Sequence, residues 1–215
     1  MSLITYHKCD LRIQPILNSD VLLNRLICHL GTATIEIEED GFKCLVKYII
    51  GQQISDKARE TIWKRMSSYL SNVSPEEILT APSDSLRELG LSGRKVQTIK
   101  QLASNVLEGK INFESHQNLS NTEIISILTT VKGIGKWTAE MYLIFSLNRL
   151  DILSLGDGTV QRAIGWIYPQ DYQNRSLATF RALWQPYATI ISAFLWKASA
   201  LGLMQSPFDE VIPPR

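Results

Sequence analysis

Two features between residues 131 and 158 could together carry chemistry: a glycine-rich turn and a single carboxylate. The turn, Val131-Lys-Gly-Ile-Gly-Lys-Trp137, can adopt positive φ because it contains glycine. It precedes a helix, and amide N–H groups at a helix N-terminus favour a phosphate. Asp157 lies 22 positions after Gly135, at the expected N-cap of a helix over 158–168. Together they predict an enzyme that holds a DNA backbone and acts on one nucleotide.

Asp157 by itself is also explained as a plain helix N-cap, since aspartate is a preferred cap. The two roles are compatible, because a helix N-terminus keeps a carboxylate ionised. Cleavage of an N-glycosidic bond builds positive charge on the deoxyribose, as in glycoside hydrolysis. A fixed carboxylate can stabilise that charge, or can orient or deprotonate the attacking water. The residues themselves do not separate these two contributions.

The elements around the turn are expected to be helices. Apolar residues at helical spacing lie before it, at 124–131, and after it, at 139–147, which predicts a helix-hairpin-helix. Elsewhere N-cap residues precede apolar faces, at Asp20, Asp40, Ser55 and Ser92, with capping boxes at Ser74–Glu77 and Ser120–Glu123. The fold class is therefore all-α. Further helices are expected at 83–89, 176–184 and 187–201, with an extended arm over 1–17, a loose tail over 207–215 and no strand pair.

Composition sets limits on partners and location. The 215 residues carry a net charge of only +1, so DNA binding would need local clustering of residues such as Arg94, Lys95, Lys100, Lys132 and Lys136. Each of these taken alone is more simply a solvated surface residue. Three widely spaced cysteines form neither a zinc pattern nor a disulfide framework, which favours a reduced intracellular location, in cytoplasm, nucleoid or nucleus. No run of about 20 apolar residues predicts a membrane span.

Several motifs together resemble the helix-hairpin-helix/Gly-Pro-Asp DNA glycosylases, most closely the 3-methyladenine DNA glycosylase II type. They are Gly133–Ala139 with Asp157, Ile49–Ser55, Leu91–Gln97, and Trp184-Gln-Pro-Tyr187 before Leu195-Trp196. The resemblance implies two helical lobes with a cleft between them, where Asp157 would lie. One lobe is contiguous, 36–147, and contains the hairpin; the other combines 1–35 with 148–215. It also implies a monomer acting on double-stranded DNA with damaged bases, without a metal or cofactor.

The same resemblance assigns roles to individual residues. Asp157 would be catalytic, and the base-binding candidates are Trp137, Trp196, Met141 and Tyr142. The DNA-binding candidates are Gln52, Gln53, Ser55, Gly133, Gly135, Lys136 and Thr138. Gln53 is the first choice for the residue that wedges into the duplex when the target nucleotide is flipped out. For the tryptophans core packing is the simpler reading, and for the glutamine pair a solvated helix end.

Departures from the family pattern refine the prediction. A tryptophan face attracts the positive charge of an alkylated purine, but Met141 stands where a well-known bacterial relative has an aromatic residue. Relatives that also cut the backbone carry a lysine at 137, whereas here Lys136 is one place too early and faces the phosphates. Ala188-Thr189 replaces a frequent Arg-Ser and is expected to remove a structural or phosphate contact. A β-branched residue at Gly135 is expected to conflict with positive φ.

The leading hypothesis is therefore a monofunctional DNA glycosylase that excises alkylated purines and leaves an abasic site. Two alternatives stay open from the residues. One is a glycosylase for another lesion, such as an oxidised or deaminated base. The other is a helix-hairpin-helix module that binds DNA without catalysis. The chain has no cysteine after Cys44, so the iron–sulfur cluster of some relatives is not expected.

Overall fold

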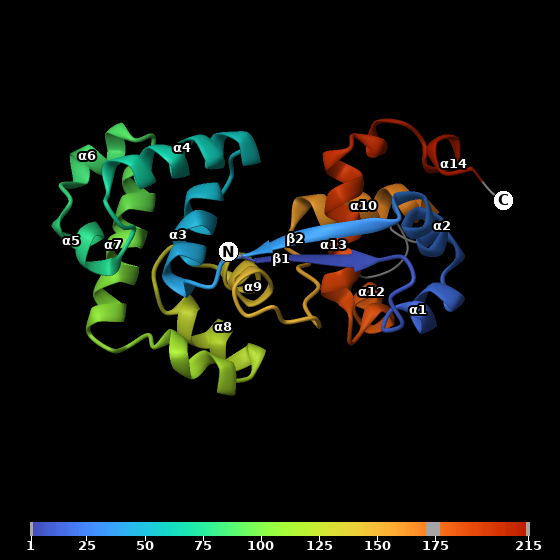
Figure 1. The fold of residues 1–215 in the computed structure, drawn as a ribbon, viewed down its shortest axis with the longest axis horizontal. Coiled ribbons are helices and arrows are strands. Elements are labelled where there is room, and N and C mark those ends of the chain that lie inside the picture. Colours follow the sequence, from blue (N-terminus) through green and yellow to red (C-terminus); the bar gives the residue numbers. More distant parts are fainter. Residues whose placement is uncertain (1, 171–176, 214–215) are drawn as a thin grey trace. The chain divides into compact units, whose positions relative to one another are not determined.

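The computed structural model describes residues 2–170 and 177–213. Helices dominate the described residues (Figure 1). The chain divides into two compact units: unit 1 comprises Met1–Ile37 and Asn148–Arg215, and unit 2 comprises Glu38–Leu147. Unit 1 is thus built from two separate stretches of chain, whereas unit 2 is continuous.

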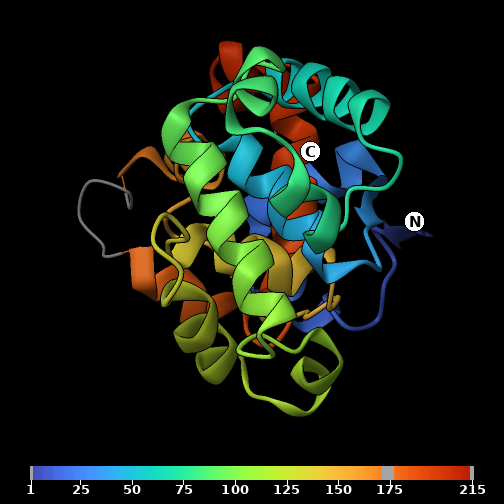
Figure 2. The same ribbon diagram turned by 90° about the vertical axis from the view of Figure 1, so that its left-hand side faces the viewer.

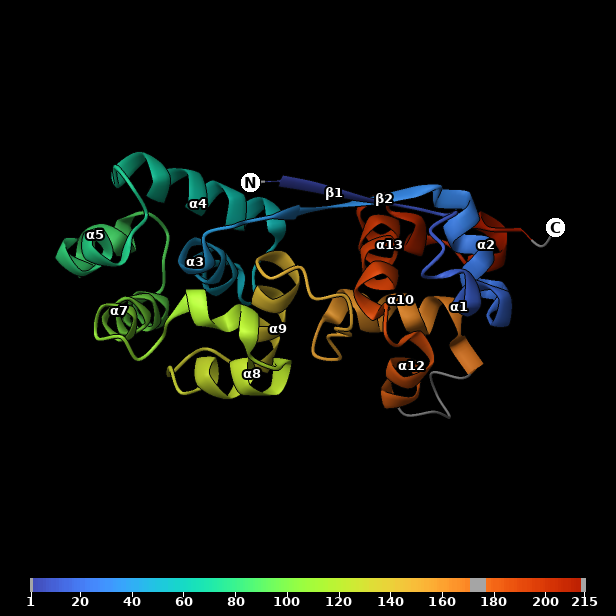
Figure 3. The same ribbon diagram turned by 60° about the horizontal axis from the view of Figure 1, so that its bottom comes forward.

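Unit 1 combines a two-stranded sheet with helices from both ends of the sequence. Its elements are β1 (Ser2–His7), α1 (Gln14–Ser19), α2 (Val21–Leu30), β2 (Thr32–Ile37), α10 (Gly158–Ile167), α12 (Leu177–Trp184), α13 (Ala188–Ala200), the 3-10 helix η2 (Leu203–Gln205) and α14 (Phe208–Val211). The central helix is α13, which packs against β2, α2, α10 and α12 (Figure 3).

Unit 2 is entirely helical within the described residues. Its elements are α3 (Gly41–Gly51), α4 (Asp56–Tyr69), α5 (Pro75–Thr80), α6 (Ser83–Glu88), α7 (Gly93–Leu107), the 3-10 helix η1 (Phe113–Asn118), α8 (Asn121–Thr129) and α9 (Lys136–Phe145). Helix α7 runs along the unit with α5 and α6 packed against it (Figure 2). Helix α3 contacts α4, α7 and α9, which makes it the centre of this unit's core.

The expectation of no strand pair was wrong. β1 pairs antiparallel with β2, in a register that sets Ser2 opposite Ile37 and His7 opposite Thr32. In β2 the side chains of Ala33, Ile35 and Ile37 are buried and alternate with more exposed residues, the period-two pattern of a half-buried strand. β1 buries only Tyr6 fully, so its own pattern gives little signal. The expected arm over 1–17 is this strand followed by α1.

The predicted helix starts are confirmed at the capping residues. The side chains of Asp20, Asp40, Ser55 and Ser92 each accept a bond from a backbone N–H in the first turn. The capping box at Ser120–Glu123 is complete. The predicted box at Ser74 is only half formed. Ser74 caps its helix, but the carboxylate of Glu77 turns outside to the Ser71 hydroxyl and the Asn72 amide.

The tail is more ordered than expected. Over the part that the structure describes, it forms α14, whose Phe208 is buried and packs edge-on against Trp166 with ring centroids 4.9 Å apart. Asp209 forms an ion pair with Arg25 at 2.8 Å. The predicted helix 176–184 corresponds to α12, although residue 176 lies outside the described residues.

Candidate active site and nucleic-acid interface

The glycine-rich turn depends on Gly133. Its φ of +99° belongs to a region that favours glycine, and a Cβ there would lie 2.1 Å from the Thr98 hydroxyl oxygen. That hydroxyl donates to the Lys132 carbonyl at 3.1 Å, so α7 and the turn are in direct contact. Ile134 is buried beneath the turn and anchors it to the core of unit 2. The turn is therefore held in a fixed shape, with Gly133 itself exposed.

The expectation of positive φ at Gly135 was wrong. Gly135 has φ −94° and ψ 176°, an extended conformation that any residue adopts, and it serves as the N-cap of α9. A Cβ at this position would meet no atom within 4 Å. The conformational need for glycine therefore lies at the first glycine of the turn alone. The sequence could not distinguish them, because both glycines fit the same turn pattern.

The two adjacent glutamines have different surroundings. Gln52 Nε2 donates to the Gly133 carbonyl at 3.0 Å and to the Thr138 hydroxyl at 2.9 Å. Thr138 is buried, so both polar side chains are used within the protein. Gln53 is exposed and adopts a left-handed conformation, φ +57°. Ser55, two residues after Gln53, caps α4: its hydroxyl accepts a hydrogen bond from the Ala58 amide at 3.3 Å.

Asp157 is fixed at the start of α10. Its Oδ1 accepts hydrogen bonds from the amides of Thr159 and Val160, both at 2.9 Å. The residue is half-buried, and its own amide donates to the Ser154 carbonyl at 3.1 Å. The carboxylate is therefore oriented by backbone groups that cannot swing away. Such a group is suited to stabilising a developing positive charge without reorganisation.

The segment leading to Asp157 is tied to α13 and to the residue that follows α12. The Thr189 hydroxyl donates to the Arg149 carbonyl at 2.7 Å and accepts from the Ile152 amide at 3.1 Å. Gln185 Nε2 donates to the Asp151 carbonyl at 2.8 Å. The sequence predicts that Ala188-Thr189 lacks a contact made by the family's Arg-Ser. Thr189 nevertheless has a structural role of its own, because its fully buried hydroxyl ties down this segment. Sequence reasoning did not find this role.

A cluster of partly exposed aromatic side chains surrounds Trp137 in unit 2. Tyr48 from α3 stacks on Phe145, with centroids 5.2 Å apart, and meets the Trp137 ring edge-on at 6.1 Å. Arg59 lies over the Tyr48 ring at 5.6 Å. Tyr48 and Phe145 were not among the predicted base-binding residues. They come from two helices whose contact no local pattern reveals.

The other base-binding candidates are placed differently. Met141 and Tyr142 are buried in α9, and the Tyr142 hydroxyl lies 2.9 Å from His116 Nδ1. Burial lowers the pKa of His116. Trp196 is half-buried on α13 in unit 1. Of the four candidates, Trp137 and Trp196 therefore offer aromatic surface that is partly accessible.

Two lysines near the turn have distinct partners. Lys136, 61% exposed, lies 3.9 Å from the carboxylate of the buried Glu140 one turn later in α9. Lys95 Nζ donates to the carbonyls of Ile50 and Gln52, at 2.7 and 2.8 Å. Burial lowers the pKa of Lys95. Lys136 is thus available at the surface, whereas the half-buried Lys95 is engaged by backbone carbonyls.

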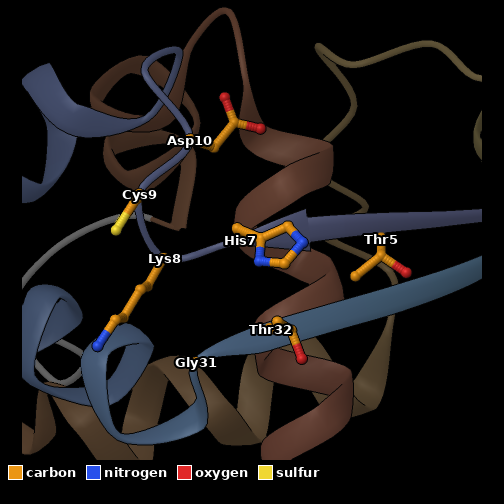
Figure 4. Close-up of a pocket in the computed structure, with 7 residues that line it drawn as sticks. All are labelled: Thr5, His7, Lys8, Cys9, Asp10, Gly31 and Thr32. Atoms are coloured by element: carbon orange, nitrogen blue, oxygen red, sulfur yellow. The ribbon is translucent and has the colours of Figure 1, made fainter.

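A surface cavity of about 480 Å³ lies in unit 1, at the end of β1. Its lining includes His7, Lys8, Cys9 and Asp10, but these side chains project in different directions (Figure 4). The carboxylate of Asp10 is bound to Arg12, at 2.6 Å. No group of three or more potential metal ligands occurs in the described part of the chain. Among these residues, no helix is long and apolar enough to cross a membrane.

Comparison with known proteins finds a family of DNA repair proteins and a similar DNA glycosylase. Residues 46–189 match the family described as HhH-GPD superfamily base excision DNA repair protein. The DNA-3-methyladenine glycosylase 1 of Schizosaccharomyces pombe is 32% identical over 176 residues, 79% of this chain and 77% of that protein.

Solved structures of 3-methyladenine glycosylases are also similar to this chain. A DNA-3-methyladenine glycosidase from Bacillus halodurans is 30% identical, with a TM-score of 0.80 over 97% of this chain and 98% of that one. A 3-methyladenine DNA glycosylase of Schizosaccharomyces pombe in complex with abasic DNA is also 30% identical. Its TM-score is 0.78 over 84% of this chain and 92% of that one.

Proposed function

The chain belongs to the HhH-GPD superfamily of base excision DNA repair proteins, and we propose from this premise that it is a DNA glycosylase that excises alkylated purines. The observation that carries the proposal is Asp157, a carboxylate oriented by two amides at the N-terminus of α10. Capping alone does not require an aspartate, because a serine or an asparagine caps a helix about as well. The names of the relatives, 3-methyladenine glycosylases, support the substrate class.

In the proposed reaction Asp157 faces the sugar of the target nucleotide. The C1′–N bond breaks, and its electron pair leaves with the base. A purine methylated at N3 or N7 is cationic in DNA, so it departs as a neutral molecule. The carboxylate stabilises the positive charge on the sugar while water forms the new C1′–O bond and gives up its proton to that carboxylate or to solvent. The products are the free base and an abasic site.

The phosphate contacts are assigned to unit 2. The amides that open α9 bind the backbone without regard to sequence, because phosphate contacts carry no base information. Exposed Lys136 adds charge beside them. Gln53 is the proposed wedge, since it is the exposed glutamine of the pair. The protein acts as a monomer in this proposal.

Trp137 supports two parts of the proposal: that the excised bases are cationic purines, and that no lyase step follows. Its partly exposed ring can attract a cationic purine, by about 0.5–2 kcal/mol. A lyase reaction needs an amine that reaches the sugar with its lone pair free. Lys136 is the adjacent amine, but an adjacent residue on a helix points about 100° away. Its ammonium group lies 3.9 Å from the Glu140 carboxylate, on the same helix.

The experiment is incubation of the protein with methylated duplex DNA, followed by chromatography of the released bases. We expect 3-methyladenine and 7-methylguanine in the supernatant. Matched duplexes that carry an oxidised or a deaminated base are incubated in parallel; release from these alone, with none from methylated DNA, would identify a glycosylase of another lesion class. Binding of DNA without release of any base would leave only a DNA-binding module.

A further inference from the structure

We propose that Lys95 and Gln52 are positioning residues that hold Gln53 in the conformation needed to enter the duplex. The inference deepens the proposed glycosylase function and rests on it. It concerns the short segment 51–55 between α3 and α4, and all of the contacts that carry it lie within unit 2.

The first observation is the backbone of Gln53. A φ of +57° is uncommon for a residue other than glycine, asparagine or aspartate. Such a conformation persists only where the surrounding structure holds it, and it occurs often at functional sites. Gln53 is exposed, so its own side chain has no buried packing to hold it. The restraint must come from its neighbours.

Lys95 supplies one restraint. It stands near the N-terminus of α7, and its ammonium group bridges the carbonyls of Ile50 and Gln52, at 2.7 and 2.8 Å. Carbonyls at the end of a helix have no partner within it, and a cation there also complements the helix dipole. The bridge therefore ends α3 at a fixed place and fixes the peptide that precedes Gln53.

Gln52 supplies the second restraint. Its side chain reaches the Gly133 carbonyl and the Thr138 hydroxyl, at 3.0 and 2.9 Å. Gln52 is thus bonded through its backbone carbonyl to Lys95 and through its side-chain amide to the turn. The wedge and the phosphate-binding turn consequently form one connected hydrogen-bonded unit. DNA bound at the turn meets Gln53 already in place, which lowers the ordering cost of insertion.

A different role for Lys95 would be direct phosphate binding, and the contacts argue against it. Two of its three N–H donors point to backbone carbonyls, and the side chain is half-buried. Loss of a phosphate contact weakens binding to every sequence and lowers the salt slope of log K by about 1. Loss of a positioning residue leaves the salt slope unchanged and acts through Gln53.

The chain offers a matched control in Lys100, which the sequence placed in a candidate basic cluster but which the structure engages with the backbone at the end of α5. It lies on the same helix, is half-buried like Lys95, and donates to the carbonyls of Leu79 and Ala81 at 3.1 and 2.6 Å. It therefore ends α5 as Lys95 ends α3, and neither of these hydrogen bonds involves the segment 51–55. Replacing either lysine with methionine removes one charge and two hydrogen bonds, and it shortens the side chain to the same extent.

The test measures single-turnover excision of 7-methylguanine from duplex DNA by Lys95→Met, Gln53→Ala, their double mutant, and Lys100→Met. The salt dependence of duplex binding is measured for the same variants. We expect Lys95→Met and Gln53→Ala each to slow excision by about tenfold. The double mutant should be no slower than Gln53→Ala. Lys100→Met should remain near the wild-type rate, and Lys95→Arg, which restores donors, should recover part of the loss.

Additive effects in the double mutant, a Lys95→Met rate equal to that of Lys100→Met, or a reduced salt slope would each overturn the inference. If Lys95→Met does not fold, as judged by circular dichroism, the same comparison is made with Gln52→Leu and Gln53→Ala. A wild-type protein that releases no 7-methylguanine would instead contradict the proposed function, so the two failures are distinct.

Discussion

The hydroxyl of Thr98 occupies the space beside Gly133, so that a Cβ on residue 133 would lie 2.1 Å from the hydroxyl oxygen. We expect Gly133→Ala to destabilise the protein by about 1–3 kcal/mol, because it combines this clash with a strained φ. Binding to undamaged and abasic duplexes should weaken equally. Fluorescence anisotropy and thermal melting measure both effects.

Gly135→Ala is the control for that substitution, because its φ is ordinary and its Cβ position is open. Near-wild-type stability and binding are expected. Equal losses in both variants would show that the difference in backbone conformation between the two glycines has no consequence.

Asp157→Asn should abolish base release while DNA binding remains. The asparagine oxygen can still accept the amides of Thr159 and Val160, so the start of α10 is preserved. Only the negative charge opposite the cationic sugar is lost. Single-turnover excision and binding to abasic DNA are the two measurements. A variant that excises at the wild-type rate would remove Asp157 from the mechanism.

Thr189→Val should lower both stability and excision rate. It removes the hydroxyl that joins Arg149 and Ile152, and leaves buried backbone groups without their partner, at a cost of about 1–3 kcal/mol. The segment leading to Asp157 then loses one of its ties. Ser192→Ala on the same helix is the control, since that hydroxyl bonds only within α13, to Ala188. We expect Ser192→Ala to keep the wild-type rate.

The helices could be predicted from sequence because their caps are local. Asp20 or Ser92 bonds to a backbone N–H three residues later, and a linear pattern records such a contact. The sheet could not, because β1 pairs with a strand beyond two helices and has little alternation of its own. The roles of the adjacent glutamines could not be separated either. They depend on a backbone angle at Gln53 and on the distant turn that Gln52 reaches.

Mild acid should destabilise unit 2 through His116. Burial lowers the pKa of this imidazole in the folded protein, whereas the unfolded chain titrates near 6.5. The unfolded state therefore binds more protons, so the free energy of unfolding is fully retained above about pH 6.5 and declines as the pH falls through the folded pKa. Melting temperatures of wild type and His116→Gln between pH 7.5 and 5 test this. A decline of equal size in both would assign it to other groups.

The product should be intact abasic DNA. Strand breaks are expected only after alkali or heat, and borohydride should trap no covalent protein–DNA complex, because Trp137 stands where an amine would be needed. Gel electrophoresis with and without reductant makes the measurement. A trapped complex that disappears in Lys136→Ala would demonstrate a bifunctional enzyme.

The division of unit 1 into two stretches of sequence has a consequence for its synthesis. The apolar side of β2, formed by Ala33, Ile35 and Ile37, is packed by α13, whose first residue is Ala188. A ribosome completes all of unit 2 before it makes α13, so the continuous unit can fold on the emerging chain. Until then the apolar side of β2 lacks the helix that packs on it in the folded unit. Such transiently exposed apolar surface and strand edges are what make a folding intermediate prone to aggregation.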